Sequence, residues 1–283
     1  MSRRPRPTHD RPQTIQAALD QAAEALRTRN FADAERLAAG VLKSNRNHVA
    51  AAQILGQSLL LQNRPADAIE ALRGPARRSL DPALETLLAR ALTDAGRGDE
   101  ALDRLRAATT RRPAYPLAFL ELGDRLGQLG RQDEGIEVFE AGLALAPDAV
   151  VLRVGLAYLH LNRNALDAAR ALFTEVRAAA PQRRDALLGL AHVLVADGDH
   201  ATAADLYRQA LAARGDDLAT RISLGKCLLE MGVRGAGEAA LRDAARGGDA
   251  MAGAAITALA AAPHGRLFLR PSAAAEFLRA VAA

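Results

Sequence analysis

The residues able to do acid–base, nucleophilic or metal chemistry are few and scattered. The six histidines are His9, His48, His160, His192, His200 and His264. A zinc-binding helix places two histidines four residues apart around a glutamate, and no two of these have that spacing. Cys227 is the only cysteine, so neither a thiolate-rich metal site nor an internal disulfide can form.

Signatures of nucleotide binding and acyl transfer are also missing. Gly225-Lys226-Cys227 lacks the preceding glycine and the following Ser or Thr of a phosphate-binding loop. No Gly-x-Ser-x-Gly elbow occurs. Cys227 falls in a predicted helix, where a lone cysteine is usually an inert packed residue. We therefore expect no enzyme, and we assign no catalytic residue, no cofactor and no metal ligand.

The composition is that of an all-α protein. Apolar residues make up 49% of the 283 residues, but aromatic residues make up only 3%. The apolar content is mostly Ala and Leu, which are strong helix formers and pack helix against helix. Few β-branched or aromatic residues remain from which strands could be built.

Charge and hydropathy bear on the partner class and on the location. The net charge is +4 and is carried by arginine, since Lys43 and Lys226 are the only lysines. Nucleic-acid binders gather such charge on one face, whereas here it is spread along the chain, so we do not expect nucleic acid as the main partner. No apolar run approaches the roughly 20 residues of a membrane span. Arg3 and Arg4 are not followed by the apolar stretch of an export signal. We expect a cytoplasmic, bacterial-type protein.

Three landmarks recur along the chain every 33 or 34 residues: a small residue, a turn residue and a second small residue. In chain order the seven sets are Ala22, Arg29 and Ala34; Gly56, Asn63 and Ala68; Ala89, Gly96 and Ala101; Gly123, Gly130 and Gly135; Ala157, Asn164 and Ala169; Ala191, Gly198 and Ala203; Gly225, Gly232 and Gly237. The seven units begin near Ile15, Val49, Pro82, Pro116, Val150, Arg184 and Leu218. Such a period is the signature of a repeat protein.

The residue pattern within each unit predicts two antiparallel helices. Leucines four residues apart, such as Leu88 and Leu92, give the first helix an apolar face. The small landmark residues let the two helices approach closely. Large residues are expected to fill the space against the next unit, at Leu105, Phe139, Phe173, Tyr207 and Leu241.

The ends of the helices can also be predicted. Gly or Asn at the turn ends the first helix in a left-handed conformation, and Arg29 departs from that rule. Pro113, Pro147 and Pro181 prevent the second helix from continuing.

This pattern resembles the tetratricopeptide repeat family over residues 15–251. The resemblance implies an α-solenoid, a right-handed superhelix of about seven helix-turn-helix repeats of 34 residues, followed by a C-terminal capping helix. Three features depart from the pattern. The opening aromatic residue is present only as Phe119. Gly74-Pro75 predicts a short or kinked second helix in the second repeat, and Gly232, Gly235 and Gly237 predict an irregular last repeat.

The sequence divides into three parts. Residues 1–12 carry three prolines and four arginines and are predicted to be a disordered basic tail. Residues 13–251 hold the repeat array. Residues 252–283, including a predicted final helix, either cap the last apolar face of the solenoid or dock a partner. Deletion of residues 264–283 would distinguish these two roles.

The resemblance also implies where a partner would bind, because in this family the first helices line a concave groove. The predicted groove residues are Arg90, Glu121, Asp124, Tyr158, Asn162, His192 and Lys226. Tyr158, His192 and Lys226 recur 34 residues apart and should form a row. The family's clamp of Lys, Asn and Arg for a terminal carboxylate is absent, because Leu19, Ile54 and Leu87 occupy such positions.

The sequence is compatible with three functions. The leading one is a non-catalytic scaffold or adaptor that binds a peptide or helix of a partner protein in the groove. The second is an accessory or regulatory subunit of an enzyme complex, docked through the C-terminal helix. The third is a binder of nucleic acid or an anionic surface, using arginines of the tail and of second helices such as Arg104, Arg106, Arg111 and Arg112.

Overall fold

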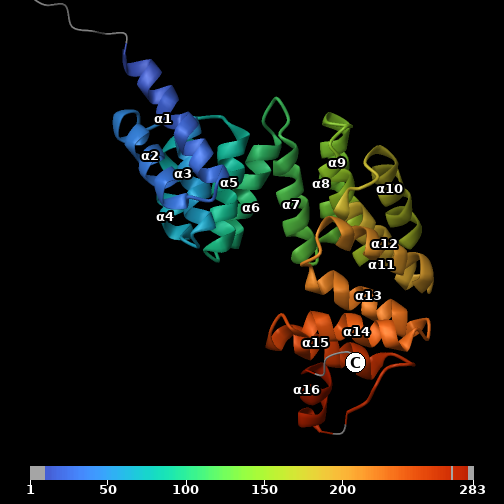
Figure 1. Ribbon diagram of the computed structural model, residues 1–283. Helices are drawn as coiled ribbons and strands as arrows, with labels where there is room; N and C mark the ends of the chain where they lie inside the picture. The colour runs from blue at the N-terminus through green and yellow to red at the C-terminus, as the bar shows by residue number, and fades with distance from the viewer. Residues whose placement is uncertain (1–9, 269, 280–283) are drawn as a thin grey trace, which may run out of the picture. The chain divides into compact units, whose positions relative to one another are not determined.

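In the computed structural model, residues 10–268 and 270–279 are described, and these residues form sixteen helices and no strand (Figure 1). The all-α solenoid predicted from the sequence is confirmed.

Within the described part, no helix has both the length and the apolarity needed to cross a lipid bilayer. The predicted tail lies outside the described residues up to residue 9, but residues 10–12, which we had assigned to the tail, are helical.

The helices alternate as first and second members of seven hairpins. The first helices are α1 (Asp10–Arg27), α3 (Val49–Leu61), α5 (Pro82–Asp94), α7 (Pro116–Gln128), α9 (Val150–Asn162), α11 (Arg184–Ala196) and α13 (Leu218–Glu230). The second helices are α2 (Phe31–Ser44), α4 (Pro65–Arg78), α6 (Gly98–Thr109), α8 (Gln132–Leu145), α10 (Leu166–Ala179), α12 (His200–Ala213) and α14 (Arg234–Ala245). Two further helices follow, α15 (Asp249–Ala261) and α16 (Pro271–Arg279).

The chain divides within α9 into two compact units, residues 1–152 and residues 153–283. We call them unit 1 and unit 2. In unit 1 the hairpins follow one another in chain order from α1 to α8, and each first helix packs on the next, α1 on α3, α3 on α5 and α5 on α7 (Figure 1). In unit 2, α15 packs on α13 and α14 as the first helix of a further repeat would, and α16 packs on α14 and α15.

The small landmark residues are points of close helix contact. A Cβ atom at Gly123 in α7 would lie 2.5 Å from the ring of Phe139 in α8. In unit 2 a Cβ atom at Gly225 in α13 would lie 2.8 Å from the side chain of Leu241 in α14. Real Cβ atoms do not approach carbon this closely, so a larger residue would push the helices apart. The five large residues predicted to fill the inter-repeat space are all buried: Leu105, Phe139, Phe173, Tyr207 and Leu241.

The turns between paired helices follow the predicted backbone rule. Gly96, Gly130, Gly198 and Gly232 have positive φ angles, and so do Asn63 and Asn164. Arg29 takes the same conformation, with φ 62°, although its side chain gives it no advantage there. The hairpin geometry therefore imposes the left-handed turn even where the residue disfavours it.

The structure shows neither the expected shortening of α4 nor an irregular last repeat. Helix α4 runs through Gly74 and Pro75 to Arg78 and is 14 residues long, the same length as α8, because Pro75 and Ala76 are buried in the core near its C-terminal end. In the last repeat, α13 and α14 are regular helices. Gly225 and Gly237 face each other there, so that a Cβ at Gly225 would lie 3.2 Å from the carbonyl oxygen of Gly237.

Candidate functional site

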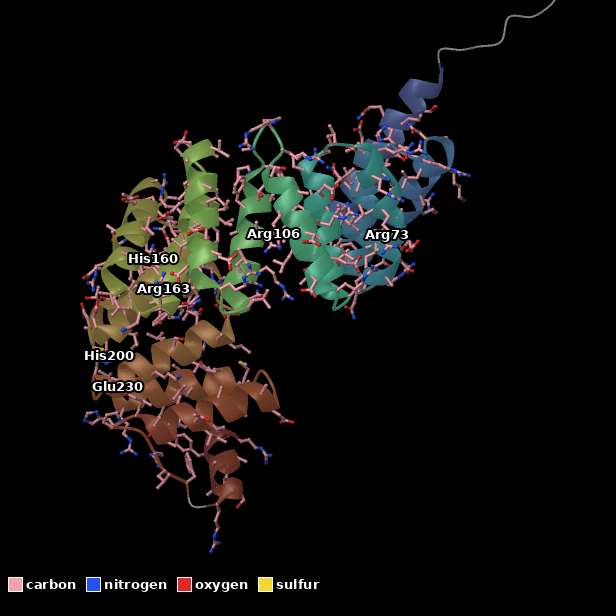
Figure 2. The ribbon with its side chains drawn as sticks, turned by 180° about the vertical axis from the view of Figure 1, so that it is seen from behind. Arg73, Arg106, His160, Arg163, His200 and Glu230 are labelled. Atoms are coloured by element: carbon pink, nitrogen blue, oxygen red, sulfur yellow. The ribbon has the colours of Figure 1, made fainter. Side chains whose placement is uncertain are left out.

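A pocket of about 420 Å³ lies on the surface that α11, α13 and α15 form in unit 2. We call the surface made by successive first helices the first-helix surface. Buried Tyr207, Cys227 and Ala258 form the deeper part of this pocket. Its rim is polar and is formed by His192, His200, Ser223, Lys226, Glu230 and Thr257. Figure 2 shows His200 and Glu230, from α12 and α13, at one edge of unit 2.

Two of the predicted groove residues meet at this pocket. His192 and Lys226 are 34 residues apart, occupy equivalent positions on α11 and α13, and both line it with exposed side chains. The ring of His192 lies 5.8 Å from that of Tyr207, centroid to centroid. Partial burial lowers the pKa of His192, which favours the neutral imidazole. We refer to this cavity as the His192–Lys226 pocket.

Tyr158, the third member of the predicted row, makes contacts within the fold. Its hydroxyl donates to the backbone oxygen of Asp185 at 3.1 Å, and its ring meets Phe173 edge-on at 5.0 Å. Burial raises the pKa of Tyr158 to about 12, so the hydroxyl keeps its proton and remains a donor. Tyr158 thus links α9 to α10 and to the start of α11. Asn162, also predicted, lies exposed at the end of α9.

Two polar residues of the pocket rim, Thr257 and His200, were not selected from the sequence. Thr257 stands 34 residues after Ser223, but it lies beyond residue 251, where the repeat array was expected to stop. His200 is the first residue of a second helix, so the groove rule did not point to it. The 34-residue spacing, extended one repeat further, would have found Thr257.

Cys227 is the thiol in the lining of this pocket. Burial raises the pKa of Cys227 to about 11, so its thiol is protonated near neutrality and is a poor nucleophile. Within the described residues, no three His, Cys, Asp or Glu side chains are placed to hold a metal ion.

A second pocket, of about 370 Å³, lies on the first-helix surface of unit 1. It is lined by residues of α3, α5 and α7 together with Tyr115, which precedes α7. The predicted groove residues Arg90 and Glu121 both line it. Asp124 lies one turn beyond Glu121 with an exposed side chain. Its pKa is nevertheless raised to about 6, mainly by the surrounding protein and also by the charge of Glu121.

The C-terminal segment, residues 263–279, is tied to the last repeat of unit 2 by side-chain contacts. Glu238 in α14 is buried and accepts hydrogen bonds from Arg234 at 2.8 Å and from Arg266 at 2.7 Å. The His264 ring donates to the carbonyl oxygen of Leu229 at 3.0 Å. These contacts hold the segment against the last repeat.

Aromatic and apolar contacts extend this attachment to α16. The guanidinium groups of Arg242 and Arg266 lie 5.0 Å and 4.7 Å from the ring centroid of Phe277. Ala274 and Leu278 are buried. The apolar face of α16 is therefore covered within unit 2, as that of a cap would be.

Stacked helical hairpins with this period define an α-solenoid, and comparison with known proteins identifies its class. Models described as "Tetratricopeptide repeat" match residues 86–150 and 128–193. The model for "Anaphase-promoting complex, cyclosome, subunit 3" matches residues 27–108. These matches span residues 27–193, more than half of the sequence. The chain belongs to the tetratricopeptide repeat family.

Solved structures agree with this assignment. A tetratricopeptide repeat protein from Parabacteroides merdae is 15% identical, with a TM-score of 0.63 over 94% of this chain and 98% of that chain. A thermophilic tetratricopeptide protein of Thermus thermophilus is 24% identical, with a TM-score of 0.55 over 64% and 99%. The pilF protein of Pseudomonas aeruginosa is 21% identical, with a TM-score of 0.60 over 75% and 96%. At these identities the neighbours establish the fold. No curated protein matches the sequence.

Repeats of this family generally mediate protein–protein interaction or scaffolding. The comparisons name no partner for this chain.

Proposed function

We propose that this chain is a non-catalytic, cytoplasmic scaffold or adaptor that binds a peptide or helical segment of a partner protein along its first-helix surface. The observation that carries the proposal is the His192–Lys226 pocket, which has a buried aromatic and apolar interior and a polar rim. An apolar side chain of the partner would enter the interior, and the rim would fix its orientation.

The pocket is formed by packed helices, which favours binding with little rearrangement. Tyr207 and Cys227 are held by the core of the repeat, so their positions do not depend on the partner. A preformed site loses less conformational entropy on binding than a flexible one. His192 and Lys226 differ from these residues because they are exposed and can be removed without opening a cavity.

The two alternative functions have less support. Ala274 and Leu278, on the apolar face of α16, are already buried within unit 2. Docking a partner through this face would therefore require α16 to detach from unit 2. Several arginines on second helices already have acidic neighbours. Arg106 lies 3.6 Å from Asp103 and Arg73 lies 3.8 Å from Glu70, which reduces their attraction for phosphates. Figure 2 shows Arg73 and Arg106 on α4 and α6.

The proposal is tested by affinity capture from the native cell extract with quantitative mass spectrometry. The variants are His192→Ala with Lys226→Ala, and Tyr158→Phe, which removes the hydroxyl but keeps the ring that packs on Phe173. The matched control is Lys43→Ala, which removes the only other lysine and lies on α2.

We expect a protein that the wild type and Lys43→Ala capture equally and that the His192→Ala/Lys226→Ala variant loses. Capture of the same proteins by all forms would reject the pocket as the binding site. Tyr158→Phe should retain capture if Tyr158 acts through the fold and should lose it if its hydroxyl contacts the partner.

A further inference from the structure

The pocket of unit 1 differs in chemistry from the His192–Lys226 pocket. Gln53, Gln57, Thr86 and Glu121 supply oxygen acceptors along its wall, and Tyr115 supplies an aromatic ring. Arg90 is the single basic residue that lines it. We call it the Tyr115 pocket.

Glu121 lines this pocket, and a second carboxylate, Asp81, contacts the lining residue Gln53. Asp81 accepts a hydrogen bond from the Gln53 amide at 3.3 Å and from the backbone of Ala83 at 2.8 Å, so it is fixed at the start of α5. Tyr115 and Glu121 line the pocket together, and burial, with the charges of Asp81 and Glu121, raises the pKa of Tyr115. An aromatic ring and a carboxylate in one pocket form an environment that suits a cation.

Arg90 lines the pocket beside Glu121 and compensates only part of the negative charge there. Burial raises the pKa of Glu121, and Arg90 offsets only part of this increase, while Asp94 adds to it. The neighbouring charge that acts on Asp124 is Glu121, which has the same sign. Carboxylates that are partly removed from water and only partly compensated by a cation are stabilised further by a cation that a ligand supplies.

The charge of the surface decides between classes of partner. An acidic segment would meet Asp81, Glu121 and Asp124 and would be repelled. An apolar segment would displace water from these carboxylates without replacing its hydrogen bonds. A guanidinium or ammonium group would donate to Glu121 and to the glutamine oxygens and would lie against the ring of Tyr115. The volume of about 370 Å³ accommodates a long side chain.

We infer that the first-helix surface of unit 1 binds a cationic segment of a partner protein, with an Arg or Lys side chain in the Tyr115 pocket. This inference rests on the proposed function, because it specifies the chemistry of the segment that a binding surface of this chain takes. It assigns to unit 1 a preference that the His192–Lys226 pocket does not share.

The test uses the full chain and a fluorescein-labelled peptide of repeating Gly-Arg-Ser-Lys, followed by fluorescence anisotropy. The variant is Glu121→Gln with Asp124→Asn, which keeps the size of both side chains and removes two charges. The matched control is Glu70→Gln with Asp103→Asn, which removes two charges from exposed carboxylates on α4 and α6 of the same unit. A peptide with Glu in place of Arg and Lys tests the sign of the charge.

We expect the cationic peptide to bind the wild type and the control with similar affinity. The Glu121→Gln/Asp124→Asn variant should bind it about 10-fold more weakly, as expected for the loss of close charge-assisted contacts. Added salt should weaken binding to the wild type, and the glutamate peptide should not bind. Tyr115→Ala should also weaken binding of the cationic peptide.

Three results would overturn the inference: no binding of the cationic peptide to the wild type, equal losses in the variant and the control, or equal binding of the glutamate peptide. Circular dichroism and thermal unfolding confirm that the variants are folded. None of these variants changes the His192–Lys226 pocket, so failure here leaves the proposed function intact if capture still depends on Lys226. If capture is also unaffected by the loss of His192 and Lys226, both proposals fail.

Discussion

The Nε atom of Arg266 donates to the carboxylate of Glu238 at 2.7 Å and so joins the segment after α15 to the buried surface of α14. Glu238 is 6% exposed. Burial alone would raise its pKa, but the hydrogen bonds from Arg266 and Arg234 outweigh burial, so the pKa lies below its ordinary value. The ionised carboxylate is therefore part of the attachment of the C-terminal segment.

Glu238→Gln should lower the free energy of unfolding by about 1–2 kcal/mol at neutral pH. Removing one partner of a fully buried ion pair would destabilise the fold more. Here Arg234 and Arg266 are partly exposed, so water can solvate their guanidinium groups after the substitution. A lowered pKa means that the stabilisation is present above the ordinary glutamate pKa and is lost as the pH falls through the lowered value. Urea unfolding near pH 7 and near pH 3 measures both effects.

The matched control is Asp205→Asn, which breaks an exposed pair with Arg208 in the same unit and should have little effect. An equally stable Glu238→Gln variant at neutral pH would show that the attachment of residues 263–279 does not depend on this charge.

Overpacking tests the close contact between paired helices. Ala101 in α6 is fully buried, so Ala101→Trp must displace α5 or α6 and should destabilise the chain by at least about 1–3 kcal/mol. Ala66→Trp, at an exposed position of α4, is the control with the same change in size. Thermal unfolding compares the two. An unchanged melting curve for Ala101→Trp would contradict the helix packing described here.

The contact between Gly123 and Phe139 offers a test by compensation. Gly123→Ala should destabilise unit 1, because the added Cβ would lie 2.5 Å from the Phe139 ring. Phe139→Leu should recover part of that loss when the two changes are combined, since the smaller side chain leaves room for the Cβ. A double-mutant cycle by urea unfolding measures the coupling. Additive effects would mean that the two residues do not limit the approach of α7 and α8.

The repeat period predicts much of this fold, because a fixed spacing determines both helix position and helix face. It placed the starts of α3, α5, α7, α9, α11 and α13 at the observed residues. It could not predict that α4 continues through Pro75, because that depends on burial of Pro75 by neighbouring helices. Glu238 and Arg266 are 28 residues apart and belong to different segments, so no periodic rule pairs them.

The candidate sites were predicted in part. His192 and Lys226 were selected by their spacing, and both line one pocket. The contact of the Tyr158 hydroxyl with Asp185 involves a backbone oxygen at the start of the next first helix, which residue types alone do not reveal. The partly buried carboxylates near Tyr115 likewise depend on how α5 and α7 approach each other.

Asp124 provides a test of the electrostatics in unit 1. Its pKa of about 6 lies above the usual value of 3.8. A raised pKa means that the folded chain holds this proton more tightly than the unfolded chain, so ionisation of Asp124 opposes folding as the pH rises between these values. Glu121→Gln should lower the pKa of Asp124 by removing a like charge. Glu70→Gln, on α4, should not. NMR titration of the side-chain carboxyl carbons measures the change, and a normal pKa for Asp124 in the wild type would contradict this account.

Hydrogen–deuterium exchange of the full chain, free and bound to a protein that it captures, shows most directly whether a partner binds along the first-helix surface. Binding along the first-helix surface predicts slower exchange in α11, α13 and α15, around His192, Lys226 and Thr257, with little change in the second helices α10 and α14. Protection confined to the second helices or to residues 263–279 would contradict it and would locate binding elsewhere on the chain.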